Sequence, residues 1–212
     1  MSLVGQAIGQ VFFANAAEAH RTGKLGTLVE QLYAKLAHIG LPPALILILL
    51  GPELFALAFG EQWRQAGELA RWMAFWLFLQ FVSSPLSAAV FSTTENQHYM
   101  LIFQIMMLFL RLVAIGVGAL IGNFLLTIIL FCLVSSLSYF VLFLLIVYLS
   151  NAYIKYILHE VLFSFLYSFL IITPILTVTM LSLNSLICIY AAYLCTVSLF
   201  LMRYTMIFKK SL

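Results

Sequence analysis

The chain has 212 residues, of which 65% are hydrophobic and 8% are charged, and its mean hydropathy is +1.13. A soluble domain of this length could not keep so much apolar surface away from water, so the composition indicates a protein that crosses a membrane several times. The formal net charge is only +3. We therefore expect membrane lipids as partners, and no nucleic acid.

The length of the apolar runs decides between the two folds that can span a membrane. Strands of a membrane barrel alternate polar and apolar residues over about 10 positions, whereas a membrane helix needs about 20 consecutive apolar residues. The runs in this chain are continuous over about 20 residues or more. The predicted fold is therefore an all-α integral membrane protein, a polytopic helical bundle that forms a single transmembrane domain over residues 1–212.

Polar and Gly-containing breaks divide the chain into six full spans that follow one shorter helix. Residues 2–18 are expected to be the second half of a helix whose start is missing. Only Gly122 and Asn123 separate two of the later spans, which predicts that these two helices are antiparallel neighbours. The full spans are expected at residues 28–50, 67–91, 99–122, 125–149, 157–181 and 186–208.

Prolines mark the first of these full spans. Pro42 and Pro43 interrupt it, and each removes a backbone donor and frees a carbonyl that neighbouring helices or water must satisfy inside a membrane. Gly51 and Pro52 come next. We expect this pair to end the helix.

The stretch from residue 51 to 87 combines Gly, Pro, charge and all three Trp residues. Four charges of alternating sign follow one another there at positions i, i+3, i+7 and i+10: Glu61, Arg64, Glu68 and Arg71. On a helix these side chains form one charge ladder. Trp72 and Trp76 then open an apolar run, as at the point where a membrane helix leaves the headgroup region. We interpret the ladder as an interfacial anchor, with contact to a substrate as the alternative.

The apolar run after the ladder carries one polar stripe. Gln80, Ser84 and Ser87 recur at i, i+4 and i+7. On a membrane helix such a stripe faces other protein or a cavity. Gln80 and Ser84 are therefore candidate substrate-binding residues.

Arg111 stands about halfway along the span expected at residues 99–122. A cation there costs about 2.5–3.5 kcal/mol on insertion scales. A polar and small-residue stripe with a seven-residue repeat runs through it and is expected to face the bundle interior: Gln97, Gln104, Arg111 and Gly118, extended by Gly122. Two roles remain open for Arg111, contact with a ligand in a cavity or hydrogen bonds to carbonyls that a neighbouring Pro kink has freed.

The sequence offers no catalytic or metal-binding pattern. Its seven acidic residues are all Glu and lie in or near loops and helix ends, which disfavours a carboxylate relay for ions. Three cysteines lie inside apolar runs without metal-ligand spacing. The histidines, including His38 near the start of a span, are expected to be isolated interfacial side chains. We expect no enzyme, no cofactor and no metal.

Three short segments carry a resemblance. Residues 59–67, FGEQWRQAG, follow the pattern FG-x-x-W-x-x-AG, and residues 84–87, SPLS, follow in the next span. With GQVFF at residues 9–13, they resemble the C-terminal half of bacterial polysaccharide flippases, the Wzx-type O-antigen translocases of the multidrug/oligosaccharidyl-lipid/polysaccharide exporter superfamily. The resemblance covers about residues 2–122, and residues 123–212 would add further spans.

The resemblance implies a flippase that moves undecaprenyl-pyrophosphate-linked O-antigen or capsular polysaccharide units across the bacterial inner membrane. It implies two lobes of helices around a central cavity, and this chain would supply the C-terminal lobe. The missing N-terminal lobe, or a second copy, is then an expected partner. In that cavity Arg111 would meet an anionic part of the lipid-linked oligosaccharide, and Gln104 would lie beside it.

Two other functions stay open. One is half of a drug/cation antiporter of the same superfamily, which the lack of intramembrane carboxylates disfavours. The other is a membrane partner protein that transports nothing itself.

Basic residues indicate the orientation of the bundle in the membrane. Seven of them fall on one side if the spans alternate, and two on the other, Arg64 and Arg71. Because basic loops stay in the cytoplasm, the first connector and the C-terminus are predicted to be cytoplasmic and the charge ladder periplasmic. The seven basic residues are Arg21, Lys24, Lys35, Lys155, Arg203, Lys209 and Lys210.

Cysteine labelling in intact cells tests this orientation. In a background without native cysteines, a Gln62→Cys variant should react with a membrane-impermeant thiol reagent before the cells are broken. A Lys24→Cys variant is the matched control and should react only afterwards. The reverse order of labelling would show that the bundle is inverted.

Overall fold

The computed structural model describes residues 2–180 of the chain, and of their side chains those of residue 10 and residues 12–173. The span expected at residues 186–208, and the last residue of the one expected at 157–181, lie outside this range. Within it there are six α-helices and one 3-10 turn, and no strand. The elements are α1 (Ser2–Arg21), α2 (Leu25–Phe59), the turn η1 (Glu61–Trp63), α3 (Arg64–Thr93), α4 (Gln97–Ile121), α5 (Phe124–Ser150) and α6 (Ile154–Met180).

Five of the described helices, α2 to α6, are long and apolar enough to cross a membrane. The chain is therefore an all-α polytopic membrane protein, as its composition predicts. At a rise of about 1.5 Å per residue, a helix of about 20 residues spans the roughly 30 Å of hydrocarbon. The 35 residues of α2 exceed that length, so an end of α2 projects beyond the apolar layer.

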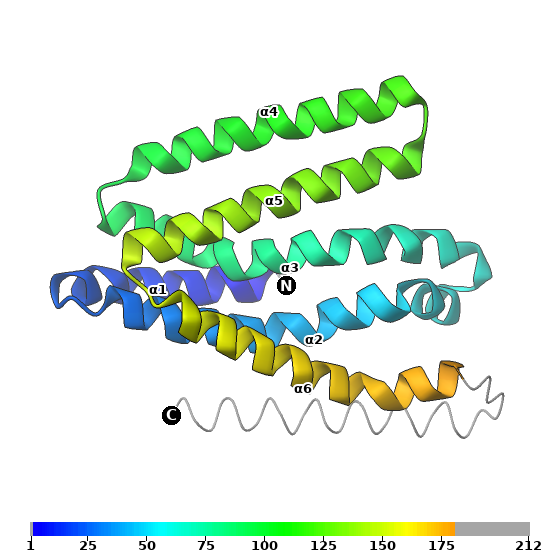
Figure 1. Ribbon diagram of the computed structural model, residues 1–212, viewed down its shortest axis with the longest axis horizontal. Coiled ribbons are helices and arrows are strands. Elements are labelled where there is room, and N and C mark those ends of the chain that lie inside the picture. The colour runs from blue at the N-terminus through cyan, green and yellow to red at the C-terminus, as the bar shows by residue number, and fades with distance from the viewer. Residues whose placement is uncertain (1, 181–212) are drawn as a thin grey trace.

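The helices lie side by side, with α3 at the centre (Figure 1). Helices α1, α2 and α5 all pack against α3, whereas α4 packs mainly on α5, and α6 mainly on α2. Most of the large side chains with almost no exposed surface come from the central elements α2, α3 and α5, and α6 adds Ile157 and Ile172. Those of the central elements include Leu36, Leu86, Val90, Phe91 and Ile146. The two flanking helices α4 and α6 thus enclose a core that the central helices build.

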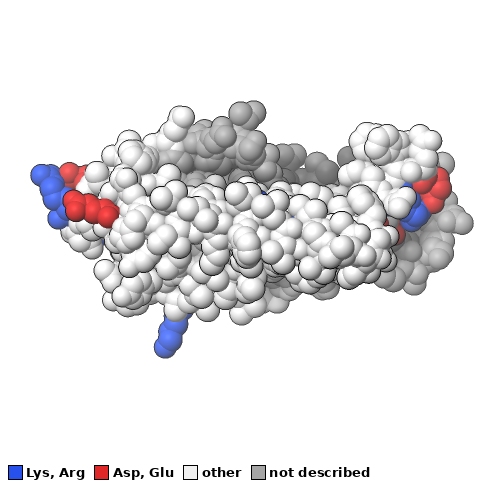
Figure 2. Space-filling view, turned by 90° about the horizontal axis from the view of Figure 1, so that it is seen from above, with Lys and Arg blue, Asp and Glu red and all other residues white. Residues whose placement is uncertain are grey.

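The outer surface of the bundle is apolar between two charged ends. Phe109 and Leu120 on α4 are 66% and 91% exposed, as expected of side chains that face lipid. On the face that Figure 2 shows, most Lys, Arg and Glu side chains gather at the two ends, and one basic side chain projects from the otherwise uncharged surface between them. This distribution matches an apolar layer bounded by two polar interfaces.

The prediction that Gly51 and Pro52 end the second helix is wrong. Helix α2 runs without interruption to Phe59, with Pro42, Pro43 and Pro52 inside it, and ends at Gly60 (φ 99°). Close packing against α3 explains the continuation: a Cβ added to Gly67 would lie 2.6 Å from the Cα of Pro52. In hydrocarbon, ending the helix would leave more backbone groups unpaired than the prolines do.

The short connection between α4 and α5 is present as predicted. Gly122 adopts a left-handed conformation (φ 71°) after the end of α4, which glycine enters without steric cost. Asn123 then caps α5, because its side-chain oxygen accepts a hydrogen bond of 3.1 Å from the backbone N–H of Leu126. These two residues reverse the chain and make α4 and α5 an antiparallel helical hairpin.

Replacement of Gly67 tests the close approach of α2 and α3. Gly67→Ala should reduce the free energy of unfolding by about 1–3 kcal/mol, because the added methyl group must push two backbones apart. The matched control is Gly116→Ala on α4, where an added Cβ meets nothing within 4 Å. Thermal unfolding of the detergent-purified variants gives the comparison. Equal stability of the two variants would show that the helices are not in backbone contact there.

Candidate functional site

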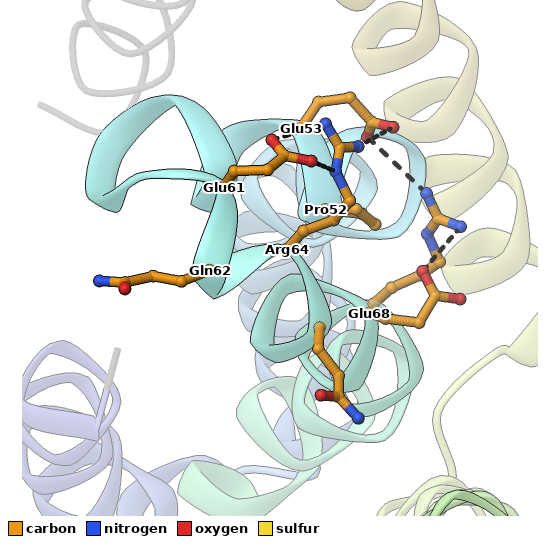
Figure 3. Close-up of a pocket in the computed structure, with 8 residues that line it drawn as sticks. Pro52, Glu53, Glu61, Gln62, Arg64 and Glu68 are labelled. Carbon is orange, nitrogen blue, oxygen red and sulfur yellow. Dashed lines mark hydrogen bonds and ion pairs between the residues drawn. The ribbon is translucent and has the colours of Figure 1, made fainter.

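A polar pocket of about 600 Å³ opens where α2 ends and α3 begins (Figure 3). The continuation of α2 past Pro52 builds it, because this last part of α2 lies against the first turns of α3. Every ladder residue predicted from the sequence lies in its wall. The lining residues are Pro52, Glu53, Glu61, Gln62, Arg64, Gln65, Glu68 and Arg71.

Ion pairs cross this pocket and converge on Glu53. Arg64 donates to Glu61 and lies 3.7 Å from one oxygen of Glu53. Arg71 lies 3.9 Å from the other oxygen of Glu53 and 3.2 Å from Glu68. Figure 3 shows Glu53 between the two guanidinium groups, while Gln62 points away from them. The ladder is thus two i,i+3 pairs joined by a carboxylate from α2.

Sequence reasoning missed the role of Glu53. The residue follows Gly51 and Pro52, and once the helix was expected to end there, Glu53 belonged to a loop without a defined neighbour. The short distance along the chain between Glu53 and the charge ladder was the available signal. If α2 continues past Pro52, the short turn at Glu61–Trp63 brings its last turns back against the start of α3, and Glu53 with them.

The charges of the pocket make it a poor site for anions. Three carboxylates and two guanidinium groups line it, and each guanidinium group is already within 4 Å of two carboxylates. Phe59 and Trp63 stand beside it, 62% and 47% exposed, with ring centroids 5.9 Å apart. Exposed aromatic rings beside a paired charge cluster are typical of the membrane–water interface.

Arg111 lies in a different environment, where α4 packs against α5 and α3. Its Nε donates a 3.0 Å hydrogen bond to the hydroxyl of Ser135 on α5. Its guanidinium carbon is 5.4 Å from the ring centroid of Trp76 on α3 and 5.0 Å from that of Phe131 on α5. Cation–π contacts of this kind stabilise a desolvated cation by about 2 kcal/mol.

One nitrogen of Arg111 remains unsatisfied. Nη2 is buried and has no hydrogen-bond partner, although a guanidinium group carries five N–H donors. No ion pair within 4 Å joins Arg111 to an acidic side chain of residues 12–173. The hydroxyl of Ser135 accepts its hydrogen bond, and the hydroxyl of Tyr139 lies close by on the same helix. Among the described residues no backbone carbonyl accepts from Arg111, as the structural alternative would require.

The predicted stripe on α4 faces the interior only in part. Gln97 and Gln104 are exposed, whereas Arg111 is partly buried and Gly118 is buried. A straight α-helix drifts by about 20° per heptad relative to a seven-residue repeat, so a stripe of three heptads leaves the buried face. The residues that pack inward follow the shorter helical period instead, and they are Phe103, Met107, Ala114 and Gly118.

The two candidate substrate-binding residues on α3 also differ in exposure. Gln80 is partly buried, and Ser84 is exposed. Two hydroxyls beside them are buried: Ser87 donates to the carbonyl of Ser84 within α3, and Ser83 makes a 2.7 Å hydrogen bond with the hydroxyl of Tyr33 on α2. No hydrogen bond in the described range joins Arg111 to Gln80, Ser84 or Gln104. Ser135 and Trp76, which do contact Arg111, carried no sequence signal that linked them to it.

Removal of the bridging carboxylate tests the ion-pair network. Glu53→Gln should lower the free energy of unfolding by at most about 1 kcal/mol, because the partners are partly exposed. Glu61→Gln, the control, should cost less, since Glu61 contacts Arg64 alone. About 1 M salt, where the Debye length is about 3 Å, should remove the difference. A difference that persists at high salt would mean that Glu53 acts through packing.

Comparison of the chain with protein-family models, curated proteins and solved structures finds no match. The likeness to polysaccharide flippases therefore depends on the short segments at residues 9–13, 59–67 and 84–87. Membership of that family is a proposal.

Proposed function

We propose that the chain forms part of a flippase that moves lipid-linked oligosaccharide across the bacterial inner membrane. The FG-x-x-W-x-x-AG pattern at residues 59–67 supports the family, and an all-α polytopic bundle is the architecture that such transport requires. The proposed substrate is an undecaprenyl-pyrophosphate-linked O-antigen or capsular unit. The proposed orientation has the connector before α2, and the C-terminus, in the cytoplasm.

The observation that carries this proposal is the unpaired nitrogen of Arg111. A buried guanidinium group with a free N–H pair can donate to a phosphate or carboxylate, and a charge-assisted bond of this kind is about twice as strong as a neutral one. Arg71 also has a buried unpaired nitrogen, Nε, but carboxylates lie within 4 Å of the guanidinium groups of both Arg64 and Arg71 and neutralise their charge. Arg111 is therefore the proposed contact for the anionic part of the substrate, pyrophosphate or an acidic sugar.

The proposed transporter has a second lobe. In alternating access, two bundles rock against each other around a site between them. The described helices form one bundle around α3, so they supply one wall of such a site. The other wall would come from an N-terminal lobe or from a second copy of this chain.

Variants of Arg111 test the proposal in a flippase-deficient strain that expresses the chain with its second lobe. Arg111→Lys should reduce glycan export about tenfold or more, since an ammonium lacks the guanidinium fork and a hydrogen bond to a charged group contributes about 1.5–3 kcal/mol. Arg111→Met should abolish export. Its membrane level should stay unchanged, because replacement of a buried charge by an apolar side chain of similar volume is often neutral.

The control for these variants is Leu112→Ala, the next residue along α4, which is 59% exposed and should leave both export and membrane level unchanged. Ser135→Ala separates the two roles of Arg111. If Arg111 only ties α4 to α5, Ser135→Ala and Arg111→Met lower the amount of inserted protein together. That result, or full export by Arg111→Met, would refute the proposed contact.

A further inference from the structure

Several polar side chains inside the described spans find partners on other helices. Tyr33 on α2 bonds to Ser83 on α3. His38 on α2 lies 3.3 Å from a carboxylate oxygen of Glu160 on α6, so the prediction of an isolated His38 is wrong. Gln104 on α4 differs from these residues. Its side chain is exposed, and among the described residues its amide makes no hydrogen bond.

The amide of Gln104 lies within the apolar layer. The residue follows the first residue of α4 by seven positions, which places it about 10 Å along the helix axis. Its exposed neighbours Leu101, Ile105 and Leu108 are all apolar, and each is at least 61% exposed. A primary amide has two N–H donors and an acceptor oxygen, and hydrocarbon satisfies neither kind of group. This surface therefore suits another protein helix better than lipid.

The exposed residues around Gln104 follow the repeat of a helix that packs along a second helix. They recur at alternating spacings of four and three positions, which is the seven-residue repeat of a left-handed supercoil. Helix α5 does not use this repeat, because the buried residues of α4 lie on another face, at Phe103 and Met107 among others. We call the exposed part of the repeat the Gln104 seam, and it consists of Gln97, Leu101, Gln104 and Leu108.

We propose that the Gln104 seam binds the same seam of a second copy of this chain, with the two Gln104 amides paired at the centre of the interface. Two copies with the same orientation in the membrane have parallel α4 helices, and a two-fold axis along the membrane normal places Gln104 opposite itself. Because the amide both donates and accepts, the two side chains can exchange two hydrogen bonds. A single polar residue in such a seam also fixes the register and the number of helices.

The position of α4 leaves room for this partner. Helix α4 lies at the outer edge of the described helices (Figure 1) and packs mainly on α5, so a second copy can approach without displacing a described helix. The seam itself contains no Lys, Arg or Glu. Arg111 continues the repeat, but its guanidinium group is held within its own bundle by Ser135, Trp76 and Phe131. The cations of the two copies therefore do not oppose each other across the seam.

Disulfide cross-linking in membranes tests the surface. In a background without native cysteines, Leu108→Cys places a thiol one turn beyond Gln104 and keeps the amide. When two copies with different epitope tags are expressed together, oxidation should give a linked dimer that carries both tags. Met106→Cys is the matched control, because Met106 is also exposed, lies at nearly the same depth and is on the opposite side of α4. It should give little dimer.

The role of the amide is tested by energy transfer between labelled copies in vesicles, over a range of protein-to-lipid ratios. Gln104→Leu should weaken dimerisation about tenfold or more, because two interhelical hydrogen bonds are lost. Its membrane level should not fall, since an exposed apolar side chain is favourable in lipid. Gln104→Asn keeps an amide and should retain most of the association.

Three results would overturn the proposal. One is equal association of Gln104→Leu and wild-type protein. The second is the absence of a doubly tagged product with Leu108→Cys, or equal amounts with Met106→Cys. The third is a cross-linked product in which a different protein replaces the second copy. Both assays measure association alone, so these results are independent of whether the chain takes part in transport.

Discussion

Backbone contact between α2 and α3 at Gly51 and Gly67 is the constraint on which the polar end of the bundle depends. Neither residue has a Cβ, and one added to Gly51 would lie 2.7 Å from the carbonyl oxygen of Gly67. This approach supports α2 through Pro52, so the helix continues to Phe59. The extra turns carry Glu53 over the start of α3, where it meets Arg64 and Arg71. The close contact between the two glycines thus positions the helices that form the pocket, and the charged side chains line it.

Two kinds of cation site result from this architecture. Arg64 and Arg71 lie at the solvent-exposed end of α3, and their guanidinium groups form ion pairs with carboxylates. Such paired charges are suited to anchoring a helix at the membrane–water interface. Arg111 lies among Trp76, Phe131 and Ser135 in the apolar part of the bundle, and its Nη2 is unpaired. An unsatisfied donor in a dry environment is expensive. Nε of Arg71 is unpaired as well, so the distinction between a structural cation and a candidate ligand contact is the carboxylate partner, which Arg111 lacks among the described residues.

The sequence was informative where one physical effect dominates. Length and hydropathy determine the helical spans, and glycine at a left-handed position determines the turn at Gly122, so these elements could be predicted. Where two effects compete, local signals fail: the breaking tendency of Pro52 is overridden by packing on Gly67. Contacts between distant segments, such as Arg111 with Ser135 or His38 with Glu160, have no local signal. The seven-residue stripe through Gln104 failed because small angular errors accumulate along a helix.

The two-residue connection between α4 and α5 has a consequence for biogenesis. Arg111 and its partner Ser135 belong to the two arms of one hairpin, 24 residues apart, and most other contacts of α4 are also with α5. Helix α4 alone would carry an unpaired cation into the bilayer, whereas the hairpin delivers the cation together with its hydroxyl and Phe131. The insertion machinery is therefore expected to release α4 and α5 into lipid as one unit, after synthesis has passed residue 150.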